Sequence, residues 1–172
     1  MSAGERRFRI RHAEPGDAAE LVALARAVGS EPEGWLVTNG DWRSVPEERR
    51  YLRAIKRSPH AAVLVAESPD RLVGRLSLSR DPHPASRHVA DLGLMVAAEH
   101  RRQGAGRALM LAADDWARSV GVRKLELHVL PYNEAAIALY EQVGYSREGV
   151  RRSHYRHGDG YVDAVLMAKE LA

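Results

Sequence analysis

The sequence contains no cysteine and only short apolar runs. Without cysteine it cannot form a disulfide framework, a thiolate zinc site or an iron–sulfur cluster, and it has no cysteine nucleophile. A membrane-spanning helix needs about 20 apolar residues, whereas the longest runs here are residues 61–66 and 108–113. The opening MSAGERRFRI also lacks the apolar stretch of a signal peptide. We therefore expect a soluble, cytoplasmic protein with no membrane partner.

The net charge is small as well. The 26 basic and 23 acidic residues leave a net charge of +3, which is too small to make nucleic acid the expected partner. All but three of the basic residues are arginine, and they are spread along the chain, so an arginine by itself is weak evidence for an anion site. The eight histidines show no metal-ligand spacing such as His-Glu-x-x-His, and we expect no metal.

The overall composition is that of a globular chain. Hydrophobic residues make up 45% and charged residues 28% of the 172 positions, which excludes a disordered, collagen-like or coiled-coil protein. Domains average about 150 residues. The length therefore predicts a single domain over residues 1–172.

Alternating apolar residues predict strands, and apolar residues at helical spacing predict helices. Before the glycine-rich segment at 101–107, the pattern predicts strands at 6–13, 61–67, 71–79 and 88–97 and helices at 15–28 and 46–56. After that segment it predicts a helix at about 104–120, a strand at 124–130, a helix at 134–143 and a hairpin of strands at 145–157 and 161–171. The long connection at 30–45 contains Trp35 and Trp42, so it has side chains to bury.

The glycine-rich segment is the sharpest local feature of the sequence. It lies directly between a predicted strand and a predicted helix, and it reads Arg101, Arg102, Gln103, Gly104, Ala105, Gly106 and Arg107. The glycines let the backbone approach a bulky anion, and the first turn of the helix offers unpaired N–H groups. Well-formed hydrogen bonds from the arginines would add about 1.5–3 kcal/mol each. The segment predicts a diphosphate cradle, with a plain tight turn as the alternative.

Two familiar phosphate-binding patterns do not fit this segment. A Walker loop requires Gly-Lys-Ser/Thr, which is absent. A Rossmann fingerprint requires a third Gly or Ala at a spacing that Ala108 misses by one position, and the next strand does not end in an acidic residue. Neither pattern therefore accounts for the segment.

The segment resembles a motif of a known family, the GCN5-related N-acetyltransferases (GNAT). Their acetyl-CoA motif is Gln/Arg-x-x-Gly-x-Gly/Ala at a strand-to-helix junction, which Arg101, Gly104 and Gly106 match. A second family motif, Asn-x-x-Ala-x-x-Leu-Tyr followed after three residues by Gly and an aromatic residue, is matched by Asn133, Ala136, Leu139, Tyr140, Gly144 and Tyr145. The predicted order of elements is also the family's. The resemblance thus covers essentially the whole chain, and it implies an α+β fold with a mixed, twisted sheet of about seven strands and helices on both faces.

The resemblance implies an enzyme that transfers acetyl from acetyl-CoA to a primary amine by direct attack in a ternary complex. The absence of cysteine agrees with direct attack. The chain end around residues 151–152 and 158–163 looks like the branch of the family that acetylates free amino acids or other small amines. A protein N-terminus or lysine is the alternative acceptor, and a non-catalytic CoA-binding module is the alternative function. Many relatives in the family are homodimers, so the resemblance also implies a homodimer.

The resemblance further implies where the coenzyme lies. The diphosphate would lie on residues 101–107, and the pantetheine arm would lie beside the backbone of Met95 and Val96, where that strand splays from the strand at 124–130. Asn133 would hydrogen-bond to the coenzyme, and a helix cap is its alternative role. Tyr140 would protonate the leaving thiolate, and a packed aromatic is its alternative role.

The attacking amine must lose a proton. At pH 7 this costs about 1.4 kcal/mol for an α-amino group and about 4.6 kcal/mol for a lysine amine. Asp91, on the minor face of its strand, is the candidate base, and burial would raise its pKa. A structural carboxylate paired with an arginine is the alternative. Glu126 and His128 share a face of the next strand and are second-choice bases or substrate-side residues.

Four aromatic residues are candidates for the acceptor pocket. They are Trp35, Trp42, Tyr155 and Tyr161. Packing in the core is the alternative for each. The segment at 30–45 would then close over a small molecule, while an open acidic groove would suit a basic peptide.

Overall fold

The computed structural model describes residues 8–37 and 42–172. Within these residues the chain forms seven strands, β1 Arg9–His12, β2 Ala61–Glu67, β3 Leu72–Arg80, β4 Val89–Val96, β5 Lys124–Val129, β6 Ser146–His157 and β7 Gly160–Glu170. The described α-helices are α1 Ala18–Gly29, α2 Val45–Lys56, α3 Ala105–Ser119 and α4 Glu134–Gln142. Every predicted element is present within a few residues of its expected bounds. The first predicted strand begins at residue 6, of which residues 6 and 7 lie outside the described part.

Local signals explain where the helices begin and end. Ser44 caps α2 with Glu47 in a reciprocal capping box, so the helix begins one residue before Pro46, the residue predicted to open it. The carboxamide oxygen of Asn133 accepts from the Ala136 amide and caps α4. Gly144 follows α4 with a positive φ of 97°, which favours glycine.

The strands form one mixed sheet in the order β1-β2-β3-β4-β5-β7-β6. All neighbouring strands are antiparallel except β4 and β5, which are parallel. The predicted mixed sheet of about seven strands is therefore confirmed. The terminal hairpin turns through Gly158 and Asp159, with His157 paired to Gly160, as the glycine pattern predicts.

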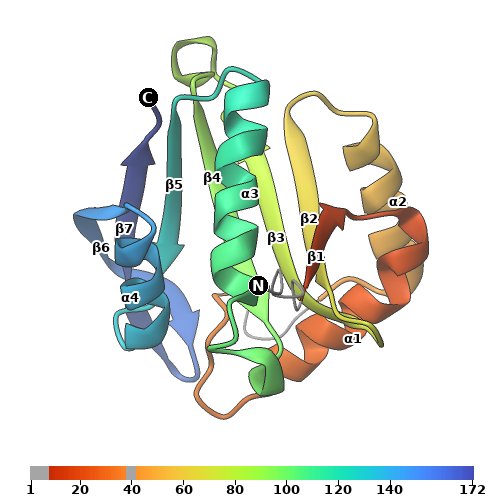
Figure 1. Ribbon diagram of the computed structural model, residues 1–172. Helices are drawn as coiled ribbons and strands as arrows, with labels where there is room; N and C mark the ends of the chain where they lie inside the picture. Colours follow the sequence, from red (N-terminus) through yellow and green to blue (C-terminus); the bar gives the residue numbers. More distant parts are fainter. Residues whose placement is uncertain (1–7, 38–41) are drawn as a thin grey trace, which may run out of the picture.

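Helices cover both faces of this sheet, as predicted (Figure 1). Leu109 and Met110 of α3 pack with one face of the central strands, including Leu76 and Leu92. Leu21 of α1 and Leu52 of α2 pack with the other face, on residues that include Val63 and Met95. Because side chains alternate along a strand, each central strand contributes to both cores.

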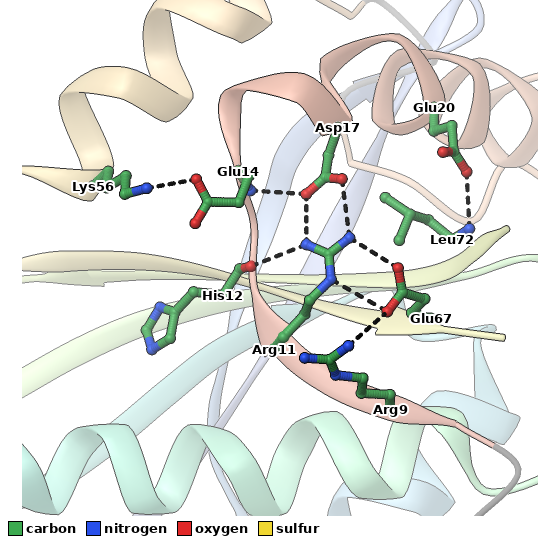
Figure 2. A network of polar contacts seen from close by, with 9 residues as sticks. All are labelled: Arg9, Arg11, His12, Glu14, Asp17, Glu20, Lys56, Glu67 and Leu72. Atoms are coloured by element: carbon green, nitrogen blue, oxygen red, sulfur yellow. Dashed lines mark hydrogen bonds and ion pairs between the residues drawn. The ribbon is translucent and has the colours of Figure 1, made fainter. Parts of the chain in front are cut away.

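A charged network fastens the edge strand β1 to its neighbours (Figure 2). The Arg11 guanidinium donates to both oxygens of Asp17, at 2.7 and 3.0 Å, and to Glu67 on β2 at 3.1 Å. Asp17 also accepts from the Glu14 amide at 2.7 Å. Burial opposes ionisation of Asp17, but the hydrogen bonds from Arg11 and Glu14 prevail and lower its pKa. The network fixes the short β1 and the start of α1 beside the sheet.

The two parallel strands separate soon after they meet. Val89, Ala90 and Asp91 of β4 pair with Lys124, Leu125 and Glu126 of β5. Beyond Asp91, β4 continues beside β3 as far as Val96, and β5 continues beside β7 as far as Val129. The predicted splay is thus present, and it opens a gap at the carboxyl ends of β4 and β5.

Candidate active site

The glycine-rich segment forms the start of α3, next to the end of β4. The 3₁₀ turn Ala98–His100 follows β4, and Gly104 is the N-cap of α3, with no side chain to cap the helix. The first backbone bond of the helix runs from the Ala108 amide to the Gly104 carbonyl at 2.9 Å. The amides of the first turn precede this bond and have no acceptor within the helix. They therefore form a group of donors suited to a diphosphate.

The local geometry explains why glycine occupies positions 104 and 106. Gly104 has a φ of 95°, in the left-handed region that disfavours other residues. A Cβ on Gly106 would lie 3.0 Å from Leu139 Cδ2 of α4 and 3.7 Å from Val96 Cγ2 of β4. Glycine at 106 thus lets the start of α3 lie close to both α4 and β4.

The polar side chains of the segment point to different partners. Arg102 and Arg107 are exposed. The Gln103 carboxamide donates to the Glu99 carbonyl at 2.9 Å. The Arg101 guanidinium binds both oxygens of Glu31, at 2.7 and 2.6 Å, and its Nε donates to the Val96 carbonyl at 3.0 Å. Arg101 was predicted to bind the coenzyme, but its guanidinium already has an anionic partner, Glu31.

The gap between β4 and β5 lies beside the predicted pantetheine residues. Met95 is buried in the core formed with α1 and α2, so only its backbone faces a ligand in the gap. Val96 is partly buried against the core under α3. Its carbonyl already accepts from Arg101, and a carbonyl oxygen can accept a second hydrogen bond.

The second motif residues lie across the gap on α4 and its cap. Asn133 uses its oxygen as the helix cap, which leaves the carboxamide NH₂ for a ligand. Tyr140 is buried, with 6% of its surface exposed, and its ring lies 6.1 Å from the ring of Tyr145. Burial raises the pKa of Tyr140 to about 12. Its hydroxyl is therefore protonated throughout the neutral range.

Two carboxylates lie where β4 and β5 part. Asp91 is directly paired with Glu126, and both point to the sheet face away from α3. The residue Asp91 is exposed at the surface, yet partial desolvation of its carboxylate by the neighbouring strands and then the like charge of Glu126 raise its pKa to about 6. Within the described residues no arginine forms an ion pair with Asp91. The structural alternative, a carboxylate paired with arginine, finds no support.

His128 and Tyr155 are joined at the same face. His128 Nδ1 lies 2.7 Å from the Tyr155 hydroxyl, and the His154 ring lies 4.7 Å from the Tyr155 ring. Partial burial and then the Arg151 charge lower the pKa of His128, which favours the neutral imidazole. Burial and then the Asp91 carboxylate raise the pKa of Tyr155, which places this pair close to Asp91. The structure thus gathers the candidate bases and Tyr155 at one site.

The other aromatic candidates are separated from one another. The Trp42 ring lies 4.8 Å from the guanidinium of Arg75, and Trp42 packs against the core under α1 and α2. The Trp35 ring lies 6.1 Å from Tyr132, at the far side of the gap. Tyr161 is 72% exposed in the terminal hairpin. Trp42 thus packs against the cluster that contains Met95 of β4, whereas Trp35 contacts Glu31 and Tyr132.

Sequence reasoning missed four residues around this site. In the long connection, Glu31 accepts a hydrogen bond from Trp35, and the Gly34 carbonyl accepts one from Tyr132. The Tyr132 hydroxyl is also hydrogen-bonded to His157. Tyr132 precedes Asn133 of the second motif, so its position was a usable signal. The other three have no local signal, because their partners are distant in the sequence.

The described residues provide neither a metal-binding cluster nor a membrane-spanning helix. Residues 8–37 and 42–172 contain no group of three His, Asp or Glu side chains placed to hold a metal ion. In the same residues, none of the helices has the length and apolar character required to span a bilayer.

The family model described as the acetyltransferase (GNAT) family matches residues 31–145. The chain belongs to the GNAT family. It is 30% identical over 164 residues to the L-amino acid N-acetyltransferase AaaT of Escherichia coli (strain K12), a match that covers 93% of this chain and 96% of that protein. It is 43% identical over 74 residues to the ribosomal protein bS18-alanine N-acetyltransferase of the same strain, covering 43% of this chain and 50% of that protein.

Solved GNAT structures share the fold. The structure of yncA from Salmonella typhimurium with its cofactor acetyl-CoA aligns with a TM-score of 0.85, covering 96% of this chain and 94% of that one at 20% identity. As a GNAT enzyme, the protein is an N-acetyltransferase that uses acetyl-CoA as cosubstrate. The glycine-containing start of α3 and the part of β4 that β5 leaves unpaired suit this ligand, because both offer backbone groups for hydrogen bonds.

Proposed function

We propose that this GNAT enzyme acetylates a free amino acid or a similar small amine by direct attack in a ternary complex. The observation that carries the proposal is the match to an L-amino acid N-acetyltransferase along nearly the whole of both chains. Relatives that act on proteins match shorter stretches: one match covers half of its relative at 43% identity, and another, to an N-alpha-acetyltransferase, covers 68% of its relative at 40% identity. A protein N-terminus is therefore the second candidate acceptor.

The pKa of the candidate base favours an α-amino group, whether of a small molecule or of a protein N-terminus, over a lysine side chain. A proton passed from an α-amino group with a pKa near 8 to Asp91 with a pKa of about 6 costs about 2.7 kcal/mol. The same transfer from a lysine amine costs about 6 kcal/mol. Asp91, directly or through a water molecule, is thus better matched to an α-amino group.

The remaining residues have distinct roles in this proposal. The amides at the start of α3, with Arg102 and Arg107 beside them, hold the diphosphate. The backbone near Met95 and Val96, together with Asn133, orients the pantetheine arm in the gap. Tyr140 holds the proton that the departing thiolate requires. His128 and Tyr155 line the acceptor side next to Asp91.

The acceptor is tested by thiol release from acetyl-CoA with matched amines. We expect turnover with free amino acids and little with N-acetylated lysine derivatives or peptides that lack a free α-amino group. A panel that also contains peptides with free N-termini separates the second candidate. Turnover restricted to such peptides would replace the small-molecule proposal, and acetyl-CoA binding without turnover on any amine would favour a non-catalytic module.

The role of Asp91 predicts a specific pH dependence. The base must be unprotonated, so kcat at saturating acceptor should rise with pH through about 6 and then level off. Asp91→Asn should lower kcat at least tenfold at pH 7.5 and abolish this rise. Steady-state rates between pH 5 and 9 provide the measurement.

Glu126→Gln is the matched control for this prediction. It removes the like charge that helps to raise the pKa of Asp91, so the rise in kcat should move to lower pH while activity at pH 7.5 is retained. A rise that persists unchanged in Asp91→Asn would exclude Asp91 as the base.

Assembly and location are also proposed rather than observed. β6 is an edge strand, and Val150 on it is 57% exposed. An exposed edge of this kind is available to a second copy of the chain, which supports the homodimer that the family resemblance implies. A cytoplasmic location and a single domain over residues 1–172 stay predictions.

A further inference from the structure

A short segment after α1 spans the mouth of the gap between β4 and β5. We call residues 31–35 the strap. Figure 1 shows this orange segment running from the end of α1, past the loop that precedes α3, toward the hairpin of β6 and β7. It therefore reaches both sides of the gap in which the pantetheine arm is proposed to lie.

The first anchor of the strap is on the β4 side. Glu31 receives two hydrogen bonds from Arg101, at 2.7 and 2.6 Å, and the Arg101 Nε is fixed to the Val96 carbonyl at 3.0 Å. The geometry is bidentate, which is the strongest form of arginine–carboxylate pair. Both side chains are partly buried, so the pair is better shielded from water than a surface ion pair.

The same carboxylate holds a tryptophan. The Trp35 indole Nε1 donates to Glu31 Oε2 at 2.9 Å, and this oxygen also accepts from Arg101. The Glu31 carboxylate thus receives three donors from two residues. Arg101 fixes Glu31, and Glu31 fixes the orientation of the Trp35 ring.

The second anchor is on the β5 side. The Tyr132 hydroxyl donates to the Gly34 carbonyl at 2.7 Å and lies 3.1 Å from His157 Nε2. Because the single hydroxyl hydrogen goes to Gly34, the hydrogen bond with His157 requires a proton on Nε2. A Cβ on Gly34 would lie 2.6 Å from that nitrogen, so only glycine fits here without displacement of the histidine. The strap is therefore held at both ends of the gap.

We propose that Arg101 is a positioning residue for the acceptor site, acting through Glu31 on Trp35, and that its guanidinium is not a diphosphate ligand. Arg101 belongs to the coenzyme motif, yet its side chain is turned to the strap and its charge is already neutralised by Glu31. Arg102 and Arg107 are exposed, and Glu31 pairs with Arg101 and not with them, so they remain the candidate side-chain ligands of the diphosphate. This inference rests on the proposed function and on the acceptor-pocket role that the sequence predicts for Trp35.

The test compares three arginine variants by two separate readouts. Acetyl-CoA affinity is measured by titration calorimetry, and the acceptor KM is measured with whichever amine of the panel gives the highest turnover. For Arg101→Gln we expect the acceptor KM to rise at least tenfold while the acetyl-CoA Kd changes less than threefold. For Arg102→Gln and Arg107→Gln we expect the opposite pattern. A rise of tenfold or more in the acetyl-CoA Kd for Arg101→Gln would overturn the proposal.

A double-mutant cycle tests whether the effect passes through Glu31. Glu31→Gln should raise the acceptor KM to a similar degree, and the double variant with Arg101→Gln should be no worse than either single variant. Tyr132→Phe should raise the same KM from the opposite anchor. Additive effects of Glu31→Gln and Arg101→Gln would show that the two residues act separately and would overturn the coupling.

An acceptor-independent readout keeps this test distinct from that of the proposed function. In a nitrogen-15 NMR spectrum, the Trp35 indole signal is identified by its loss in Trp35→Phe. Arg101→Gln should shift that signal and accelerate its hydrogen exchange, because Glu31 is no longer fixed. An unchanged signal overturns the proposal even if every amine is a substrate, and a shifted signal supports it even if the panel finds no amino-acid acceptor.

Discussion

Replacing Tyr140 with phenylalanine is expected to lower kcat by about 10²- to 10⁴-fold, the usual contribution of a positioned proton donor. The acetyl-CoA Kd should change less than threefold, because the change removes one hydroxyl and leaves the ring in its buried position. The reason is the protonation state: burial raises the pKa of Tyr140 to about 12, so the hydroxyl keeps its proton wherever the amine can react. Initial rates at saturating substrates and calorimetry provide the two numbers.

Tyr145→Phe is the matched control for this change. Tyr145 is buried beside Tyr140, and within the described residues its hydroxyl has no hydrogen-bond partner. Removal of that hydroxyl should leave kcat within about threefold and should not lower the melting temperature, because an unsatisfied buried group stabilises nothing. If Tyr140→Phe keeps more than a tenth of the wild-type kcat, the proton-donor role is excluded.

Filling the start of α3 should abolish coenzyme binding. In the double variant Gly104→Val and Gly106→Val, the side chain at 106 would push against Leu139 and the side chain at 104 would occupy a left-handed backbone position. We expect the acetyl-CoA Kd to rise at least 100-fold, because the amides of the first turn can no longer approach the diphosphate. Unchanged affinity would remove the phosphate role from this segment.

A milder pair of variants separates binding from stability. Gly104 and Gly121 lie at opposite ends of α3, both have a positive φ, and a Cβ would meet no atom within 4 Å at either position. Gly104→Ala and Gly121→Ala should therefore cost similar stability, roughly 1–2 kcal/mol each, from the left-handed backbone. Only Gly104→Ala should weaken acetyl-CoA binding. Equal losses of affinity in the two variants would show that the effect is one of folding.

The arrangement of elements could be predicted because its signals are local. The glycines at 104, 121 and 144 mark the ends of helices, Asn133 marks a cap, and alternation marks the strands. The coenzyme segment was found for the same reason, since its residues are adjacent in the chain. The parting of β4 and β5 was expected from the family resemblance, and the residue at which it begins, Asp91, came from the structure.

The contacts of the acceptor side could not be predicted in this way. Glu31 and Arg101 are 70 positions apart, and Gly34 and Tyr132 are 98 apart. No periodicity or motif links residues at such distances, because these contacts depend on how the helices lie on the sheet. Arg101 illustrates the consequence: its motif predicted a coenzyme ligand, whereas its guanidinium binds the Glu31 carboxylate of the same chain.

Trp42 is a second residue whose surroundings could not be predicted from the sequence. It was a pocket candidate because a tryptophan in a connecting segment has apolar surface to bury. The structure covers it with the guanidinium of Arg75, which is itself buried beside the fully buried Glu48 at 3.2 Å. Arg75 in the middle of β3 gave no indication of this arrangement, because its partner carboxylate lies on α2.

The parting of β4 and β5 also bears on the stability of the molecule. Only three residue pairs join β1–β4 to β5–β7 by direct strand pairing. On the proposal above, acetyl-CoA runs along the free edge of β4, where a neighbouring strand would otherwise continue. The cosubstrate then serves as a structural member of the sheet, and a cell rich in it holds this enzyme in a more stable form than a cell that is depleted.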